Sequence, residues 1–255
     1  MTIGLAITGA TGRMGSTLHQ VANTRDDVEI RLSISQLEDD VNGLEVSEDS
    51  LVADLIDAEV DVLIDFTAPS SSIEYVTACA EAGIPAVVGT TGFEDNDWQS
   101  LRRSANTIPV LYAANFSRGI QVLSDIVGSV VTALDGYDIE VTETHHNAKR
   151  DAPSGTAVRL LSAIESVRDV SVRVHGRHGD TPRQSREIGV HARRAGSIPG
   201  EHEILVAGHH EVLTLTHRAS DRSVFAVGAI DAAVWLVGHD AGWYEFSDVV
   251  GSDDQ

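Results

Sequence analysis

The first half of the chain alternates short apolar runs with longer amphipathic stretches. The apolar runs predict five buried strands, at residues 2–8, 28–34, 62–67, 85–88 and 108–112. Apolar residues at helical spacing follow several of these runs, for example Leu18 and Val21 after the first. Strands that alternate with helices are typical of parallel βαβ units, so we predict an α/β fold built on a Rossmann-type parallel sheet.

The pattern changes in the second half. A long apolar stretch from 119 to 134 predicts a helix that carries the chain into a second unit. Four apolar runs then follow one another between glycine-rich turns, at residues 170–174, 188–192, 204–207 and 212–217. Strands in direct succession predict a smaller α+β unit with a mixed or antiparallel sheet. A last apolar helix is expected at 223–237, and the acidic tail after Val250 is expected to fray.

A glycine-rich loop, residues 9–15, follows the first strand and leads into a helix. Its spacing, G-x-x-G-x-x-G, is a variant of the dinucleotide fingerprint, in which glycines permit a tight turn and let the pyrophosphate approach the helix start. The fingerprint's acid, which holds the ribose 2′-hydroxyl, is missing: the second strand ends in Ser35-Gln36, which leaves room for a 2′-phosphate. Loops that begin at Gly89 and Ala113 follow two further strands. Because the carboxyl ends of parallel strands lie at one edge of the sheet, these two loops and the glycine-rich loop are expected to converge there. The alternative is a glycine-rich turn that binds no ligand.

Residues 145–156, HHNAKRDAPSGT, hold several side chains that can transfer protons or bind anions. Two histidines follow an apolar alternation at residues 139–142 that predicts a strand, and Lys149 is the only lysine among 18 basic residues. A lysine can transfer a proton, which an arginine cannot. Ser154-Gly155-Thr156 opens an amphipathic helix, and a helix start binds anions such as carboxylates. A surface lysine beside loop histidines is the alternative. No Cys/His/Asp set has metal-site spacing, so no metal is predicted.

Composition narrows the class of protein. Hydrophobic residues make up 42% of 255, so the chain should fold. We expect neither a membrane span nor a signal peptide, and the single Cys79, within a predicted helix, fits a reducing, cytoplasmic interior. A net charge of −21 argues against nucleic acid and anionic membranes as partners. Acidic excess with one lysine indicates a high-salt cytoplasm; an ordinary acidic cytosolic protein is the alternative. His209 and His210 are expected to be solvated in a hairpin turn.

Eight segments carry a resemblance to one enzyme family: residues 9–15, 64–67, 89–93, 113–117, 145–157, 194–196, 200–202 and 217–220. Over nearly its whole length the chain resembles the 4-hydroxy-tetrahydrodipicolinate reductases, also called dihydrodipicolinate reductases, of the diaminopimelate route to lysine. The resemblance implies a dinucleotide-binding domain from residues 1–117 and 223–255. It also implies a substrate-binding and oligomerisation domain from 118–222, in a homotetramer acting on a small dicarboxylate.

The resemblance also implies roles for residues. His145 would be the catalytic proton donor or acceptor and Lys149 a proton donor, while His146, Gly155 and Thr156 would hold substrate carboxylates. The expected contacts to NADPH or NADH are Gly9, Ala10, Thr11, Gly12, Arg13, Met14, Ser35, Gln36, Gly89, Thr90, Thr91, Ala113, Ala114, Asn115 and Phe116. Many members of this family carry an acidic residue and then an arginine where this chain has Ser35-Gln36, so the preference between NADPH and NADH stays open. Two alternatives remain: another Rossmann-type reductase, and an NADPH-binding sensor without catalysis.

Overall fold

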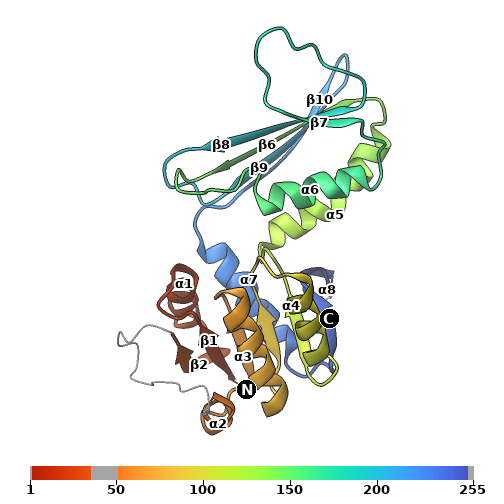
Figure 1. Ribbon diagram of the computed structural model, residues 1–255. Helices are drawn as coiled ribbons and strands as arrows, with labels where there is room; N and C mark the ends of the chain where they lie inside the picture. The colour runs from red at the N-terminus through yellow and green to blue at the C-terminus, as the bar shows by residue number, and fades with distance from the viewer. Residues whose placement is uncertain (1, 36–50, 252–255) are drawn as a thin grey trace. The chain divides into compact units, whose positions relative to one another are not determined.

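The computed structural model of the protein describes residues 2–35 and 51–251 (Figure 1). By their internal contacts, these residues form two units. The first unit comprises the described residues between Met1 and Ser117 and between Arg222 and Gln255, and the second runs from Arg118 to Asp221. Within the described residues, no helix is long and apolar enough to cross a membrane.

The first unit is built on a six-stranded parallel sheet in the order β11-β5-β4-β3-β1-β2. The strands are β1 (Ile3–Thr8), β2 (Val28–Ile34), β3 (Val62–Asp65), β4 (Ala86–Val88), β5 (Pro109–Tyr112) and β11 (Gly242–Glu245). Every residue of β3 and β4 is buried, as expected when helices cover both faces of a parallel sheet. The predicted Rossmann-type parallel sheet is confirmed.

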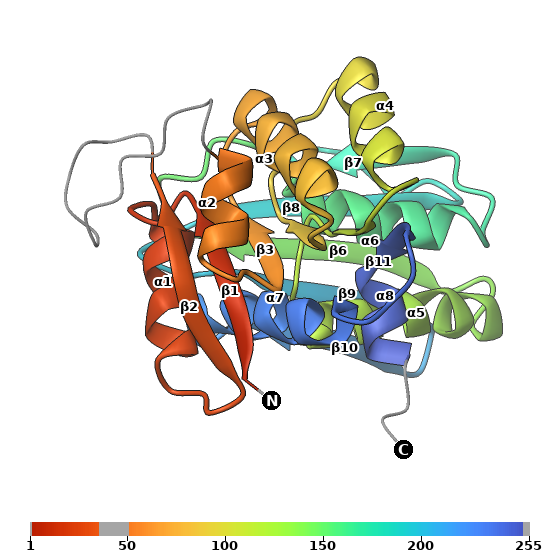
Figure 2. The same cartoon turned by 90° about the horizontal axis from the view of Figure 1, so that it is seen from below.

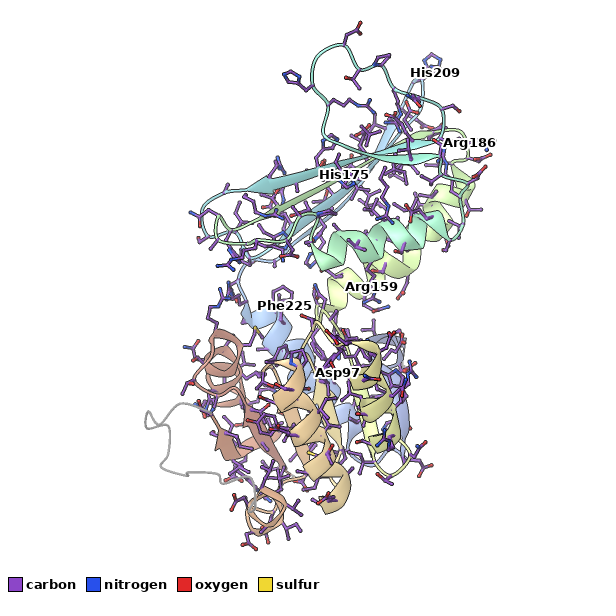
Figure 3. All side chains as sticks on the ribbon, in the orientation of Figure 1. Asp97, Arg159, His175, Arg186, His209 and Phe225 are labelled. Carbon is purple, nitrogen blue, oxygen red and sulfur yellow. The ribbon has the colours of Figure 1, made fainter. Side chains whose placement is uncertain are left out.

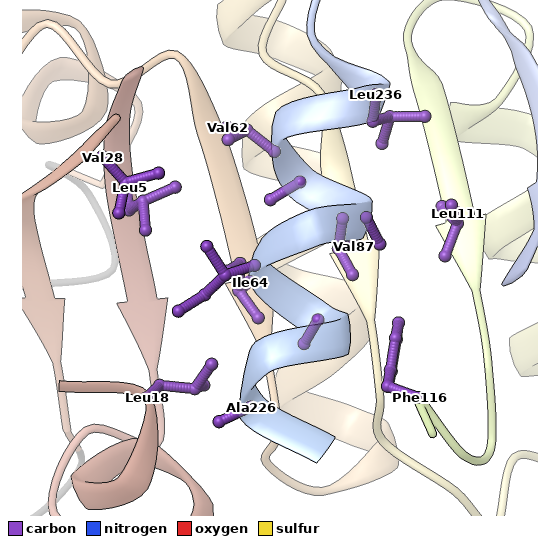
Figure 4. Close-up of a cluster of buried hydrophobic side chains, with 14 of the residues drawn as sticks. Leu5, Leu18, Val28, Val62, Ile64, Val87, Leu111, Phe116, Ala226 and Leu236 are labelled. Carbon is purple, nitrogen blue, oxygen red and sulfur yellow. The ribbon is translucent and has the colours of Figure 1, made fainter. Parts of the chain in front are cut away.

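Helices cover the two faces of this sheet. They are α1 (Arg13–Ala22), α2 (Leu51–Asp57), α3 (Pro69–Ala82), α4 (Asp95–Ser104), α7 (Ser223–Leu236) and α8 (Phe246–Gly251). Alternate strand residues point to opposite faces, so Leu5 and Ile64 join a core with α1, α7 and α8, whereas Ala6 and Leu63 join a core with α2, α3 and α4. Figure 4 shows the first core beneath α7, and Figure 2 shows the two helix groups on opposite sides of the strands.

The carboxyl-terminal end of the chain differs from the prediction. The sequence pattern ended at one apolar helix, but the structure adds the edge strand β11 and the short helix α8. Three residues of β11 are only partly buried and Glu245 is exposed, so the strand lacks the buried apolar run that marks the central strands. Trp243 of β11 packs near Trp98 and Tyr112, with ring centroids 6.2 Å from each. β11 therefore joins the sheet by parallel pairing with β5 and by aromatic contacts that no local pattern reveals.

The second unit is a five-stranded sheet in the order β10-β9-β6-β8-β7. Its strands are β6 (Asp138–His145), β7 (Val172–His175), β8 (Glu187–Arg194), β9 (Glu201–Ala207) and β10 (Val212–Arg218), and its helices are α5 (Arg118–Ala133) and α6 (Gly155–Glu165). The sheet is mixed, because β6 and β7 pair in parallel with β8, whereas β9 pairs antiparallel with β6 and β10. Apolar side chains from β6, β8 and β9 form one core with α5 and α6.

Strand limits in this unit also differ from the prediction. The expected strand at 139–142 extends to His145, and β9 begins at Glu201, three residues before the expected run. Polar residues such as Glu143 and His202 occupy these added positions and are nevertheless buried. Their burial depends on partners from other strands, which an apolar pattern cannot register. His209 lies exposed in the β9–β10 turn, as predicted (Figure 3).

Candidate active site

The glycine loop of the first unit has a backbone that only small residues allow. Gly9 has φ of +67°, and a Cβ there would lie 2.7 Å from the carbonyl oxygen of Phe66. A Cβ on Gly15 would lie 2.2 Å from the carbonyl oxygen of Gly9, so α1 begins tightly against the loop. The first N–H groups of a helix have no intrahelical partner and attract phosphate. The loop and the start of α1 thus fit the pyrophosphate of a dinucleotide.

Ser35 follows the last residue of β2, and its hydroxyl oxygen lies 2.6 Å from that of Thr11 in the glycine loop. The position next to the loop therefore holds a neutral hydroxyl in place of the usual carboxylate. Gln36, the other residue expected to contact the ribose, lies outside the described residues.

A buried carboxylate joins the ends of three neighbouring strands. Asp65 is fully buried and accepts hydrogen bonds of 2.6 Å from the hydroxyls of Thr8, Thr67 and Thr90. The backbone N–H of Thr67 also donates to Thr90 Oγ1 over 2.8 Å. Asp65 thus ties the expected cofactor loop at Gly89 to β1 and β3. Sequence reasoning did not single out Asp65, because a lone aspartate at a strand end is common.

The same region gathers the three loops that were expected to converge. A Cβ on Gly89 would lie 2.2 Å from the ring of Phe66, whose carbonyl already contacts Gly9. The rings of Phe66 and Phe116 lie 5.6 Å apart, and Asn115 Oδ1 accepts a 2.8 Å hydrogen bond from the N–H of Ser117. The Gly9, Gly89 and Ala113 loops therefore meet around Phe66.

Two arginines lie near the helix starts of the first unit. Burial lowers the pKa of Arg222, and the positive charge of Arg13 lowers it further. Neither forms an ion pair with any residue that the structure describes. Arg13 was an expected phosphate contact, whereas Arg222 was missed because it lies more than 200 residues further along the chain.

In the second unit, His145 is the last residue of β6 and is 9% exposed. Its Nδ1 lies 2.6 Å from Oε2 of Glu143, two residues earlier on the same strand. Glu143 accepts two further hydrogen bonds of 2.8 Å from the guanidinium of Arg194 on β8, and one of 3.1 Å from the N–H of Ser154. His145 and Arg194 are paired in the sheet register. Glu143 and Arg194 were not among the expected site residues.

A second buried histidine adjoins this cluster. The rings of His202 and His145 have centroids 5.2 Å apart, and His202 Nε2 lies 3.2 Å from Ser154 Oγ. Ser154 in turn caps α6 by accepting a hydrogen bond from the N–H of Ala157. Burial lowers the pKa of His202 to about 3, so this ring stays neutral at physiological pH. His202 therefore fixes the capped start of α6 without adding charge.

The other expected residues lie in the loop after β6 and at the start of α6. Lys149 N donates to the carbonyl of His146, and Lys149 Nζ lies 2.8 Å from Asp151 Oδ1. Gly155 is exposed, and a Cβ added there would meet nothing within 4 Å, so ligand can approach the helix start. His146 and Thr156 are partly buried beside these residues in the chain.

The pKa of His145 lies below its usual value. Burial lowers its pKa most, the charges of Lys149 and Arg194 lower it further, and Glu143 opposes them. A Cβ on Gly200 would lie 3.1 Å from His145 Nε2, so the glycine keeps that nitrogen uncovered. The cluster therefore presents one imidazole nitrogen beside a lysine and a helix start. Among the described residues, no group of three His, Cys, Asp or Glu side chains could hold a metal ion.

Comparisons with known proteins agree on one family. The family model described as "Dihydrodipicolinate reductase, N-terminus" matches residues 3–116, and the model for the C-terminus matches residues 119–250. The protein named 4-hydroxy-tetrahydrodipicolinate reductase from Haloarcula marismortui is 50% identical over 248 residues, which cover 96% of this chain and 98% of that protein. The protein of the same name from Natronomonas pharaonis is 48% identical and covers 96% and 99%.

The fold has solved counterparts. A dipicolinate-bound dihydrodipicolinate reductase from Paenisporosarcina sp. TG-14 has a TM-score of 0.77 at 24% identity, over 96% of this chain and 98% of that one. At that identity the likeness supports the fold alone. The Rossmann-type sheet, the glycine loop and the relatives together define a two-unit oxidoreductase that uses NAD(P)H. Within this class, the chain belongs to the dihydrodipicolinate reductase family.

Proposed function

We propose that the protein reduces 4-hydroxy-tetrahydrodipicolinate to tetrahydrodipicolinate with NADPH or NADH, in the diaminopimelate route of lysine biosynthesis. The observation that carries this proposal is the environment of His145. Its Nδ1 is held by a buried carboxylate, and its Nε2 is left uncovered by Gly200 near Lys149. A buried histidine whose pKa is tuned by neighbours is suited to proton transfer near neutral pH.

The chemistry requires a proton donor and cationic or N–H groups. The 4-hydroxyl of the substrate leaves as water: Lys149 protonates the departing oxygen and the neighbouring ring carbon gives up a proton, which leaves a cyclic conjugated imine with two carboxylates. A bound NADPH or NADH would supply the hydride that adds to ring C4. His145 delivers one proton from Nε2 to the carbon next to C4, which completes the reduction. The N–H groups at Gly155 and Thr156, with the His146 ring, hold carboxylate.

In the first unit, the Gly9–Met14 loop binds the pyrophosphate, with Arg13 as an added cation. Thr90, Thr91 and the Ala113–Phe116 loop line the rest of the nucleotide. Since Ser35 stands where an acid would repel a 2′-phosphate, we expect NADPH to be used at least as well as NADH.

A coupled assay with freshly made product of the upstream synthase tests both statements. NADPH and NADH oxidation should be followed spectrophotometrically in high potassium chloride. We expect turnover with NADPH and a kcat/KM no lower than that for NADH. A tenfold preference for NADH, about 1.4 kcal/mol, would contradict the cofactor assignment. Binding of NADPH without reduction of the substrate would favour the alternative of a sensor without catalysis. Oxidation of NADPH only in the presence of an aldehyde or sugar would favour the alternative of another Rossmann-type reductase.

Two broader expectations belong to this proposal. The protein acts in the cytoplasm, consistent with its single cysteine, and it assembles as a homotetramer, as the resemblance implies. Light scattering coupled to size exclusion in molar salt measures the assembly directly, and a monomeric mass would overturn that part.

A further inference from the structure

We propose that Glu143 is a positioning residue for His145: anchored by Arg194, its carboxylate holds the Nδ1–H tautomer and so directs Nε2 to the substrate. The inference rests on the proposed function, because it assigns a role within the same proton transfer. It adds the β6–β8 pair Glu143 and Arg194 to a site otherwise defined by the loop after β6 and the start of α6.

The hydrogen bonds of Glu143 hold its carboxylate in one orientation. Oε1 accepts from the N–H of Ser154 and from Nη2 of Arg194, and Oε2 accepts from Nη1 of Arg194. The remaining contact of Oε2, at 2.6 Å, is His145 Nδ1. The side chain of Glu143 is fully buried, so no solvent competes for these contacts.

The hydrogen-bond roles determine the tautomer. Glu143 is surrounded by a guanidinium and a backbone N–H, which are donors only, and these groups stabilise its ionised form. An ionised carboxylate only accepts, so Nδ1 of His145 must carry the proton that it donates. When His145 is neutral, its Nε2 then has a bare lone pair, and when His145 is protonated, Nε2 carries the proton to be transferred.

Arg194 prevents Glu143 from moving. Its Nη2 also donates to the carbonyl of Asp151, in the loop that carries Lys149. The groups that face His145 are thus Glu143 on its own strand, Arg194 on β8, His202 on β9 and Lys149 in the following loop. Glu143 is the only anion among these groups, so its charge stabilises the protonated imidazole that the transfer consumes.

The substitution Glu143→Gln tests this role. Two fixed donors, Ser154 N–H and Arg194 Nη2, face the Oε1 position, whereas the Oε2 position faces one fixed donor, Arg194 Nη1, and the imidazole, whose proton can move; the amide oxygen should therefore occupy the Oε1 position. The amide NH₂ then faces His145 Nδ1, which must become an acceptor, and the proton moves to Nε2. The variant should therefore hold the opposite neutral tautomer and disfavour the protonated ring. We expect kcat to fall about 100-fold or more.

A matched control lies three residues earlier on the same strand. Glu140 Oε2 lies 2.7 Å from His191 Nε2, and Glu140 also pairs with Arg183. Glu140→Gln therefore removes another β6 carboxylate that contacts a histidine and an arginine. It should leave kcat and the pH profile unchanged.

Ring ¹⁵N NMR of histidine-labelled protein measures the tautomer without turnover, and the His145→Gln variant identifies the signal. In the wild type we expect the Nδ1–H tautomer of His145, and in Glu143→Gln the Nε2–H tautomer. In Glu143→Gln, the pH at which kcat declines because His145 loses its proton should also be lower. Glu143→Asp keeps the charge and should restore the wild-type tautomer and most of the pH profile. Adding Glu143→Gln to His145→Gln should cost little further kcat, because the carboxylate acts through the ring.

The outcomes separate this inference from the proposed function. A wild-type tautomer, a wild-type kcat or an unchanged pH limb in Glu143→Gln overturns the positioning role, even if the enzyme reduces its substrate. Absence of turnover by the wild type overturns the function, whereas the tautomer shift would still support the role of Glu143. If Glu143→Gln does not fold, as judged by thermal melting and NADPH binding, Glu143→Asp decides: full loss of activity with a normal melt contradicts the inference.

Discussion

At the scale of the residue, Lys149 has the only side-chain ammonium group of the protein, and its Nζ lies 2.8 Å from Asp151 Oδ1. An arginine at this position would keep the charge and could keep the ion pair, but it could not release a proton. The substitution Lys149→Arg therefore separates a charge anchor from a proton donor.

We predict that Lys149→Arg lowers kcat by roughly 100-fold or more, in the range of general acid–base contributions. The dissociation constant of NADPH, measured by fluorescence, should stay within about twofold of the wild-type value, because Lys149 lies in the second unit and the proposed nucleotide site lies in the first. Arg150→Lys, at the exposed neighbouring position, is the control and should retain wild-type kcat. Near-wild-type turnover by Lys149→Arg would reduce Lys149 to a charge anchor.

His202 links protonation to stability. The pKa of His202 is lowered from 6.5 to about 3, chiefly by burial. Below pH 6.5 an unfolded chain binds a proton at His202 that the folded protein does not bind. Stability should therefore decrease as pH falls from about 6.5 towards 3, at up to about 1.4 kcal/mol per pH unit from this group.

Urea unfolding in molar salt at pH 7, 6 and 5 measures this slope. His202→Gln can still form a hydrogen bond with Ser154 Oγ but does not titrate, so its free energy of unfolding should depend less steeply on pH than that of the wild type. Parallel slopes for the two proteins would show that His202 is protonated, or exposed, in the folded state.

At the scale of the element, Asp65 joins the carboxyl ends of β1, β3 and β4 through three threonine hydroxyls. Hydrogen bonds to a buried charge contribute about 1.5–3 kcal/mol each, and an amide cannot accept as many. We predict that Asp65→Asn lowers the free energy of unfolding by about 2–4 kcal/mol and weakens NADPH binding several-fold.

The control lies at the opposite end of the same strands. Asp61 accepts a 2.6 Å hydrogen bond from the N–H of Gly4, just before β3 begins. Asp61→Asn should reduce stability without weakening NADPH binding, measured by fluorescence titration. If both variants bind NADPH equally well, Asp65 supports only the sheet and not the cofactor loops.

At the scale of the whole molecule, the charge is strongly negative: 39 acidic against 18 basic residues leave −21. Repulsion among exposed carboxylates extends over about 10 Å at 0.1 M salt but only about 3 Å at 1 M. We predict that the melting temperature rises markedly between 0.1 M and 2 M potassium chloride, as measured by calorimetry. A nonionic osmolyte at equal osmolality should raise it much less. An equal midpoint at low and high salt would contradict a halophilic adaptation.

The sequence by itself determined the features that depend on local chemistry. The alternation of apolar runs and amphipathic stretches predicted the parallel βαβ sheet, because strand and helix periodicities are set by neighbouring residues. The glycine loop at residues 9–15 and the HHNAKRDAPSGT segment were recognisable because their residues are contiguous. The expected residues of that segment lie at the end of β6, in the loop that follows it, where Lys149 lies, and at the start of α6.

Tertiary structure alone decided which buried polar groups meet. Glu143 contacts Arg194 across 51 positions, Ser154 contacts His202 across 48, and Thr90 reaches Asp65 across 25. A buried charge or imidazole is stable only when such partners satisfy it. No local pattern encodes pairings at these separations. Strand β11 was missed for a related reason, because it joins the sheet by pairing with β5 and through contacts of the Trp243 ring with Trp98 and Tyr112, which lie far earlier in the chain.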